Sequence, residues 1–489
     1  MIDQATALHL SNRLGFGPAP GDLGLIAGMG RDAFIDAQLH PQRGNLPQSV
    51  TAVLGSLPSF GMNSAKAYAA YWWRDQIPDP KTIPKEQKKY LKKREKQVVR
   101  DTQVARLARA VGSPWQLHEA LVEFWFNHFN VYAHKGQTKV WIGAYEAEAI
   151  RPHTLGRFSD LLLATAKHPA MLVYLDNAQN VAPVTALGNN ISPIRLRKKK
   201  QDGINENYAR EVMELHTLGV DTGYTQSDVI SLAHILTGWT VGAGAQTDAA
   251  AAAEKFGKDK GTFRFARGMH DPSRETLLGR TFSGDDVGEG EAALLMLAAH
   301  PATAYHVSFQ LAQYFVADKP DAELVASMAK TFRDTGGDLR AVMRTMLSSS
   351  AFLAPSNFAV KFKTPYRYIV SAARAAGLSP AAVEPLVDIL QGLGQPLYGC
   401  ISPDGYACTE SAWLDPNALL RRIAFATRLG AGAYGAPAMP GGEPAPLDPA
   451  RIEQTVMPAL DRSTLAIIAE IPRNRRAGAI LGSPDFMRC

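Results

Sequence analysis

The chain has 489 residues, of which 46% are hydrophobic and 20% are charged, and its net charge is +6. These proportions are those of an ordinary globular protein, and the length is sufficient to bury a large core. No apolar run approaches the roughly 20 residues that a membrane-spanning helix needs. The nearest, "LLLATAKHPAMLVYL", is interrupted by Lys167, His168 and Pro169, so no transmembrane segment is predicted.

The first residues, "MIDQATALHLSNRLGFG", lack the basic stretch and following apolar run of an export signal. The sequence as given therefore predicts a cytoplasmic location. A chain that had lost its signal would read the same, and it would be periplasmic or secreted.

Positive charge is concentrated in two runs. Residues 81–100, "KTIPKEQKKYLKKREKQVVR", hold nine Lys or Arg against two Glu, and "RLRKKK" at 195–200 adds five more bases. We expect the first run to form an exposed helical arm, about 81–111, because nine cations cannot be buried unpaired without a large desolvation cost. Both runs could contact an anionic glycan or a phosphate-bearing ligand. They could equally be a solvated helix face and a loop, and no nucleic-acid motif accompanies them.

Helical patterns dominate the rest of the chain. "SPWQLHEALVEFWFNHFNV" begins with Ser-Pro at residue 113, and "TQSDVISLAHILTGW" opens with a capping box at Thr225. His-Pro-Ala occurs at 168–170 and 300–302, where the proline suits the first turn of a new helix. Only "GTFRFARGMHD", from residue 261, resembles a short hairpin. We predict an all-α fold with few or no short strands.

Composition also suggests how the chain is divided. We expect a main helical domain over 1–429 that contains an Ala/Gly-rich loop at about 241–261. A Pro/Gly-rich linker at 430–449 would then lead to a C-terminal helical segment, 450–489, packed on the main domain. Nothing in the sequence indicates the oligomeric state.

The stretch "CISPDGYAC" places Cys400 and Cys408 on either side of turn-forming residues. Such a turn would bring the two sulfur atoms close enough to form a disulfide bridge. In an oxidising compartment the bridge would close, whereas in the cytosol both thiols would stay reduced.

The most polar helical segment begins at residue 205 with "NENYAREVMELH". At 100° per residue, Asn207, Arg210, Glu211 and Glu214 share one side of a helix, and His216 lies on the apolar side. These four side chains are therefore expected to form the polar wall of a partly buried concave site. The alternative is a solvent-exposed face with ion pairs between residues four positions apart.

The helix after Ser113 has a comparable stripe, formed by Glu119, Glu123 and Asn127, with His128 on its apolar side. If the two stripes face each other, their carboxylates and amides would line one cavity between helices, as in metal and acid–base sites of helical bundles. If they face water, they are solubilising surfaces.

Three histidine and aspartate positions are secondary candidates. His153, His270 and Asp271 lie in turn-like contexts, where polar side chains often contact ligands. Gly-rich phosphate loops, nucleophile elbows and His-Glu-x-x-His pairs do not occur in the sequence, which disfavours nucleotide hydrolysis, serine-esterase and common zinc-protease activities.

Several motifs together resemble the bacterial domain-of-unknown-function family 1800. They run in order along nearly the whole chain: "LSNRLGFGP", "FWFNHF", "RPHTLGRFSDLL", "HPAMLVYLDN", "NENYAREVMELHTLGVD", "LTGW", "HD" at 270–271, "HPATA" and "LGSPDF". The resemblance implies a large, mostly helical bacterial protein of a kind that is often exported. It assigns no chemistry to particular residues.

Three classes of function remain open. The first is an acid–base hydrolase, acting on a glycan for example, in which Glu211 and Glu214 or Glu123 are proton donor and base, while Asn207 and Arg210 orient the substrate. The second is an oxidoreductase or hydrolase that uses a divalent metal bound by these carboxylates with His128, His153 or His216. The third is a non-enzymatic surface or scaffolding protein.

Overall fold

The computed structural model describes residues 2–183, 204–242, 260–434 and 445–489, apart from Arg43, Pro78, Pro80, Asp221 and Asp285. Helices make up 62% of it, and the strands of the described residues form only two small two-stranded sheets. The prediction of an all-α fold is confirmed. The basic run at 195–200 and most of the Ala/Gly-rich loop expected at 241–261 lie outside the described residues.

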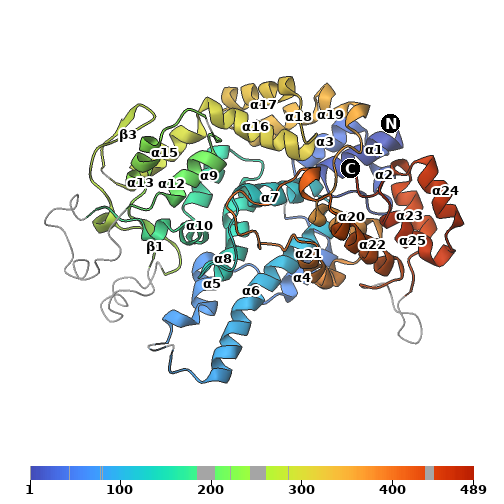
Figure 1. Ribbon diagram of the computed structural model, residues 1–489, viewed down its shortest axis with the longest axis horizontal. Coiled ribbons are helices and arrows are strands. Elements are labelled where there is room, and N and C mark those ends of the chain that lie inside the picture. The colour runs from blue at the N-terminus through green and yellow to red at the C-terminus, as the bar shows by residue number, and fades with distance from the viewer. Residues whose placement is uncertain are drawn as a thin grey trace.

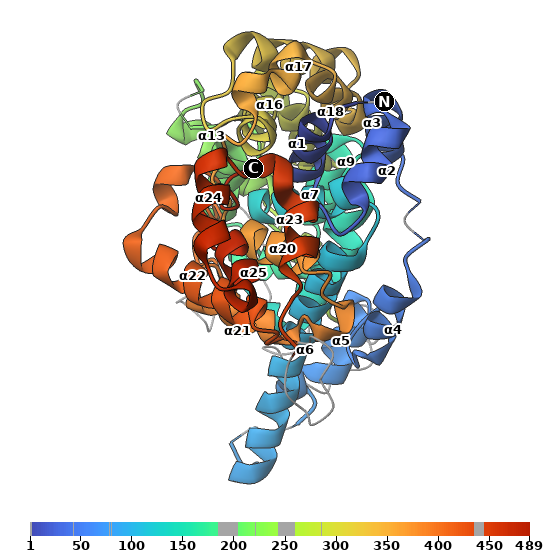
Figure 2. The same ribbon diagram turned by 90° about the vertical axis from the view of Figure 1, so that its right-hand side faces the viewer.

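In the first half, α1, α3, α6 and the π-helix η2 pack against α7, which lies near the centre of the molecule (Figures 1 and 2). In chain order the helices of this half include α1 (Gln4–Leu14), α2 (Asp22–Met29), α3 (Arg31–Leu39), α4 (Gln48–Ser56), α5 (Ser64–Tyr71), α6 (Lys85–Gly112), α7 (Gln116–His128), α8 (Thr138–Tyr145), the π-helix η2 (Glu146–Ile150), the 3-10 turn η3 (Arg151–His153), α9 (Phe158–Ala166), α10 (Pro169–Tyr174), α12 (Asn207–Glu211), the π-helix η7 (Val212–His216) and α13 (Gln226–Ile235).

The second half adds further helices over the top and one side of the molecule in Figure 1. They are α15 (Val287–Ala298), α16 (Pro301–Phe315), α17 (Ala322–Asp334), α18 (Leu339–Leu347), α19 (Ser350–Leu353), α20 (Pro365–Ala375), α21 (Glu384–Gly392), α22 (Pro416–Gly430), α23 (Pro449–Val456), α24 (Arg462–Glu470) and α25 (Arg473–Leu481).

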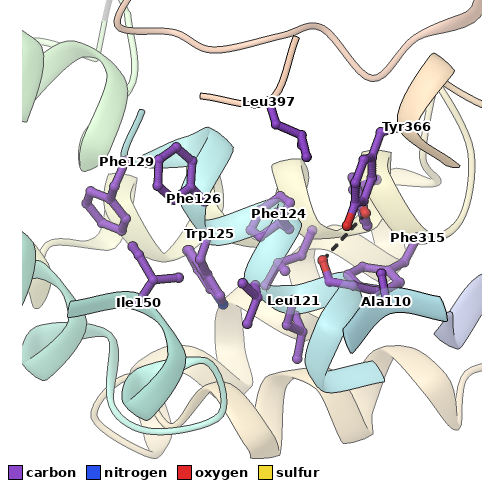
Figure 3. Close-up of a cluster of buried hydrophobic side chains, with 14 of the residues drawn as sticks. Ala110, Leu121, Phe124, Trp125, Phe126, Phe129, Ile150, Phe315, Tyr366 and Leu397 are labelled. Atoms are coloured by element: carbon purple, nitrogen blue, oxygen red, sulfur yellow. Dashed lines mark hydrogen bonds between the residues drawn. The ribbon is translucent and has the colours of Figure 1, made fainter. Parts of the chain in front are cut away.

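The core is continuous through the molecule and is built around α7, in which every residue except Asn127 is buried. Figure 3 shows the apolar side chains of α7, Phe124 and Trp125 among them, gathered with Ile150, Phe315 and Leu397 from three other segments. Burial on all sides explains why the polar side chains of this helix need partners inside the protein.

Two of the helix-start signals read from the sequence are present, whereas α7 begins at Gln116 with Trp115 as its N-cap and not at Ser113-Pro114. Thr225 and Asp228 form the reciprocal capping box at the start of α13. His168 and His300 are the N-caps of α10 and α16, and each accepts a hydrogen bond through Nδ1 from the backbone two residues on. The His-Pro pairs therefore begin helices, as predicted.

The expected hairpin at 261–271 is wrong. The strand β2 (Phe263–Phe265) pairs antiparallel with β1 (Trp239–Val241), and a 3-10 turn follows β2. The other sheet joins β3 (Glu275–Leu277) to β4 (Arg280–Phe282) in a hairpin that the sequence did not predict. The true partner of β2 comes before the Ala/Gly-rich stretch, so local alternation could not identify it.

The basic run begins α6, which projects from the molecule in Figure 2. Side chains of its first four turns, such as Lys89, Lys92, Lys93 and Lys96, are exposed, whereas the second half of α6 is buried. At the other end of the chain, α25 packs against α22 and α23. The division into a main domain, a linker and a C-terminal segment stays a prediction, and residues 435–444 of that linker lie outside the described residues.

Two further expectations concern membranes and disulfides. Among the described residues, no helix has both the length and the apolar character needed to cross a bilayer.

All three cysteines are free thiols: Cys400 donates to the carbonyl oxygen of Ser402, and Cys408 contacts the side chain of Gln313. The bridge expected between Cys400 and Cys408 is therefore not formed in this structure.

Candidate functional site

A polar cavity of about 150 Å³ lies against α7, and we call it the Glu123 cavity. Its walls come from α7, the π-helix η7, α16, the N-cap of α20 and the loop at 395–408. The residues are Glu123, Phe124, Asn127, His128, Leu215, Gln310, Gln313, Tyr314, Thr364, Gln395, Asp404, Tyr406, Ala407 and Cys408.

A smaller hollow of about 30 Å³ continues the cavity toward Arg106. The two share Glu123, Asn127, Gln395 and Tyr406 as lining residues. Carboxylate, amide, hydroxyl and guanidinium groups thus follow one another along a single polar surface inside an otherwise apolar core.

Glu123 is the buried acid of this surface, with 8% of the residue exposed. The hydroxyl of Tyr314 donates a hydrogen bond to its Oε2 atom. Burial, and after it the neighbouring charge of Glu123, raises the pKa of Tyr314 well above its usual value. The guanidinium of Arg367 stacks over the Tyr314 ring at 4.6 Å. Glu123 therefore has a hydroxyl donor beside it and a cation beyond that donor.

Asn127 attaches the loop that closes the cavity. Its Nδ2 atom donates to the carbonyl oxygen of Tyr406 at 2.8 Å, and its Oδ1 atom accepts from the Tyr406 N–H at 2.7 Å. Gly405 has φ of 73°, and a Cβ atom there would collide with the Asn127 carbonyl. Close approach of this loop to α7 thus requires glycine at 405.

Asn130, one turn further along the chain, holds the start of the same loop. Its Nδ2 atom donates to the carbonyl oxygens of Cys400 at 3.1 Å and Ser402 at 2.8 Å. Tyr174 from α10 adds a hydrogen bond from its hydroxyl to the carbonyl oxygen of Ile401 at 2.7 Å. Side chains from two helices therefore fix the backbone of the 400–408 loop.

Two further carboxylates lie at this loop, one of them within it. Asp404 is an exposed residue that lines the Glu123 cavity, and Glu211, at the end of α12, is half-buried. Burial raises the pKa of Glu211, and the charges of Glu214 and Asp404 raise it further. Glu211 thus retains its proton to a higher pH than an ordinary glutamate.

Residues 9–488 match the family model described as "Protein of unknown function (DUF1800)". The chain belongs to the DUF1800 family. No curated protein and no solved structure matches it. The resemblance drawn from the sequence motifs is confirmed, and the site of this DUF1800 chain has to be interpreted from its own geometry.

The polar segment from residue 205 does not form a wall of the Glu123 cavity. Asn207 is exposed, and Arg210 forms ion pairs with Glu206 at 3.0 Å and Glu214 at 3.3 Å, on the same side of the helix. Of this segment only Leu215 lines the cavity. The α-helix ends at Glu211 and continues as a π-helix, so a projection at 100° per residue misplaces the positions that follow.

His128 and His216, two of the histidines proposed as metal ligands, are buried beside each other, with ring centroids 6.1 Å apart. Nδ1 of His128 lies 2.6 Å from Gln310 Oε1, and its Nε2 lies 3.1 Å from the carbonyl oxygen of His216. Burial, followed by the proximity of His306, lowers the pKa of His128 to about 4. Both nitrogens of His128 thus already have partners. Across the described part of the chain, no three His, Cys, Asp or Glu side chains are grouped to hold a metal ion.

His153, His270 and Asp271 do not line the Glu123 cavity. His153 is half-buried in η3. His270 is buried, with Nδ1 2.9 Å from the carbonyl oxygen of Thr237, and Asp271 is buried 2.6 Å from Nδ1 of His234. The structure therefore does not bring these three positions together with Glu123 and Asn127.

The stripe predicted on α7 divides between two cavities. Glu123 and Asn127 line the Glu123 cavity, whereas Glu119 lines a different one. Each step of four residues turns by about 40° around an α-helix, so two steps separate the ends of the stripe by about 80°. Glu119 instead accepts two hydrogen bonds from Arg151, at 3.1 and 2.9 Å.

Several residues of the cavity were not found from the sequence. Tyr314, Gln310 and Gln313 come from α16, and Asp404 and Tyr406 come from the loop between the two cysteines. In "HVSFQLAQYF" the polar residues recur at helical spacing, and this pattern could have indicated a polar helix face. The turn "SPDGY" was considered only because it lies between two cysteines.

Proposed function

We propose that the Glu123 cavity is the catalytic pocket of an acid–base hydrolase that acts on a polyhydroxylated substrate such as a glycan. The observation that carries the proposal is the pair of carboxylates, Glu123 from α7 and Asp404 from the loop, that line one cavity with the side-chain amides of Gln310, Gln313 and Gln395. Carboxylates accept hydrogen bonds from hydroxyl groups, side-chain amides both donate to them and accept from them, and glycoside hydrolysis uses two carboxyl groups.

The environments of the acids favour different roles. Glu123 accepts a hydrogen bond from the hydroxyl of Tyr314 in the buried wall of the cavity, so we assign it the role of base or nucleophile. Asp404 is exposed on the loop that forms another wall of the same cavity, so we assign it the role of proton donor to the leaving oxygen.

Aromatic side chains support the choice of a sugar-like ligand. Phe124 and Tyr406 line the same cavity as the amides. A sugar ring has apolar C–H faces and polar edges, and sites of this kind combine apolar walls with a few convergent polar groups. Phosphate-specific sites would instead need cationic side chains in the wall, and the lining of the Glu123 cavity has none.

The test is hydrolysis of a glycan panel by the wild-type protein and by Glu123→Gln and Asp404→Asn. Both variants should lose at least about 100-fold in kcat with the fold intact, because general acid–base catalysis contributes about 10²–10⁴-fold. Glu323→Gln is the matched control, since Glu323 is exposed in the first turn of α17. Full activity in both cavity variants would refute the proposal. Glycan binding without turnover by the wild type would favour a non-enzymatic binding protein.

We further propose that the exposed lysines of α6 recruit an anionic polymer, such as an acidic glycan. Lys85, Lys89, Lys92, Lys93 and Lys96 are exposed along this projecting helix. Replacing Lys92 and Lys93 with Gln should weaken binding to an acidic polysaccharide at low salt, and the wild-type affinity should fall as salt rises. Binding that ignores both salt and these substitutions would contradict this assignment.

A further inference from the structure

Two neighbouring cavities near the end of α6 are separate from the Glu123 cavity and share none of its lining residues. The first, of about 230 Å³, is lined by Leu46, Arg109, Ser113, Trp115, His118, Glu119, Arg151 and Pro152. The second, of about 170 Å³, includes Phe60, Asp101 and Glu146 in its wall. Arg109 and Arg151 line both, so two guanidinium groups lie where the cavities adjoin.

The guanidinium of Arg151 already forms hydrogen bonds with carboxylates of the protein. It donates to both oxygens of Glu119 and, through Nε, to Glu146 at 2.7 Å. Glu146 also accepts from the hydroxyl of Tyr398 at 2.7 Å and lies 3.5 Å from Arg106. The carboxylates of this network are therefore already engaged.

Arg109 differs from Arg151 in having no acceptor. Its guanidinium stacks over Phe60 at 5.1 Å, and it forms no side-chain hydrogen bond or ion pair with any described residue. The nearby carboxylate of Asp101 accepts from Ser59 and Gln97 instead. Burial, and then the charge of Arg151, lowers the pKa of Arg109 to about 10. A half-buried cation with its donors unfilled points to a missing acceptor.

Trp115 provides an independent second donor in the wall of the 230 Å³ cavity. Its indole Nε1 atom is buried and has no hydrogen-bond partner among the described residues. The hydroxyl oxygen of Ser113, in the same wall, accepts from the Trp115 backbone N–H at 3.1 Å. The cavity thus presents unfilled donors, while Leu46 and Pro152 add an apolar surface.

We propose that this cavity binds a small oxyanion, a carboxylate or a phosphate group, with Arg109 and Trp115 as its donors. An oxyanion has only acceptors, which complements unfilled donors, and a guanidinium binds both kinds of oxyanion in bidentate fashion. The apolar surface suits a ligand that carries the anionic group on a short carbon chain. Arg109 keeps its contact with Phe60 in the free protein and gains a hydrogen-bond acceptor when the anion is bound.

The experiment is isothermal titration of the full chain with inorganic phosphate and, in a separate arm, with acetate, at ionic strength held constant with sodium chloride. At least one anion should bind, and the arm that does so identifies the oxyanion class. Arg109→Gln should raise Kd by about tenfold or more, since a charge-assisted hydrogen bond is lost. Trp115→Phe, which keeps a ring but removes the N–H, should weaken binding less.

Arg100→Gln is the matched control on the same helix, because Arg100 already pairs with Asp388 and Glu384. It should bind the anion like the wild type. Without anion, Arg109→Gln should keep the wild-type circular dichroism spectrum, so that a weaker affinity reports the lost donor. Binding of neither anion by the wild type would overturn the proposal, and so would equal affinity in the wild type and Arg109→Gln.

Discussion

Replacing Asn127 with alanine should release the loop that closes the Glu123 cavity. Asn127 makes two hydrogen bonds to the backbone of Tyr406, at 2.8 and 2.7 Å. At about 1 kcal/mol net for each bond, the loop should lose about 2 kcal/mol of local stability. Since 1.4 kcal/mol is a factor of ten, opening of this loop should become about thirtyfold more favourable.

Native-state hydrogen exchange measures this change at one atom, because the Tyr406 N–H donates to Asn127 Oδ1. In Asn127→Ala the exchange of the Tyr406 amide should accelerate about thirtyfold, while the amides in the core of α7 keep their protection. Asn130→Ala removes bonds to the carbonyls of Cys400 and Ser402, so it should loosen the loop without removing the acceptor of the Tyr406 amide. Asn207→Ala, at an exposed position, is the control. Unchanged exchange of Tyr406 in Asn127→Ala would refute the reasoning.

Other predictions concern the buried ion network. Glu119→Gln removes one of the two carboxylates that pair with Arg151, so the free energy of unfolding measured by urea denaturation should fall by about 3 kcal/mol. A decrease as small as that of the control Glu323→Gln would contradict the pairing. Burial would raise the pKa of Glu146, but Arg151 and Arg106 outweigh it and lower that pKa to about 2. Its stabilising contribution is therefore complete above the unfolded pKa of about 4.3 and is lost as pH falls from there toward 2. Glu146→Gln should reduce the slope of the free energy of unfolding against pH between about 4.3 and 2. An unchanged slope would contradict the assignment of this pH dependence to Glu146.

Part of the site could be read from the chain. Glu123 and Asn127 were singled out from polar spacing on one helix, and both line the cavity together with His128, which the same pattern had placed on the apolar side. The partners that define their chemistry were not found, since Tyr314 is 191 residues from Glu123 and Tyr406 is 279 residues from Asn127. Spacing along a helix predicts which side chains share a face, and it carries no information on what that face contacts.

The sequence by itself determined the all-α class, the capping box at Thr225, the His-Pro helix starts and the family, because each depends on neighbours a few residues apart or on motifs in order. The tertiary structure alone decided that Glu119 and Glu123 face different cavities and that the 400–408 loop lies on α7. It also decided that Arg151 forms ion pairs, whereas Arg109 forms none with any described residue. These outcomes follow from packing between distant segments. There the cost of burying an unpaired charge selects one arrangement among many that the local pattern permits.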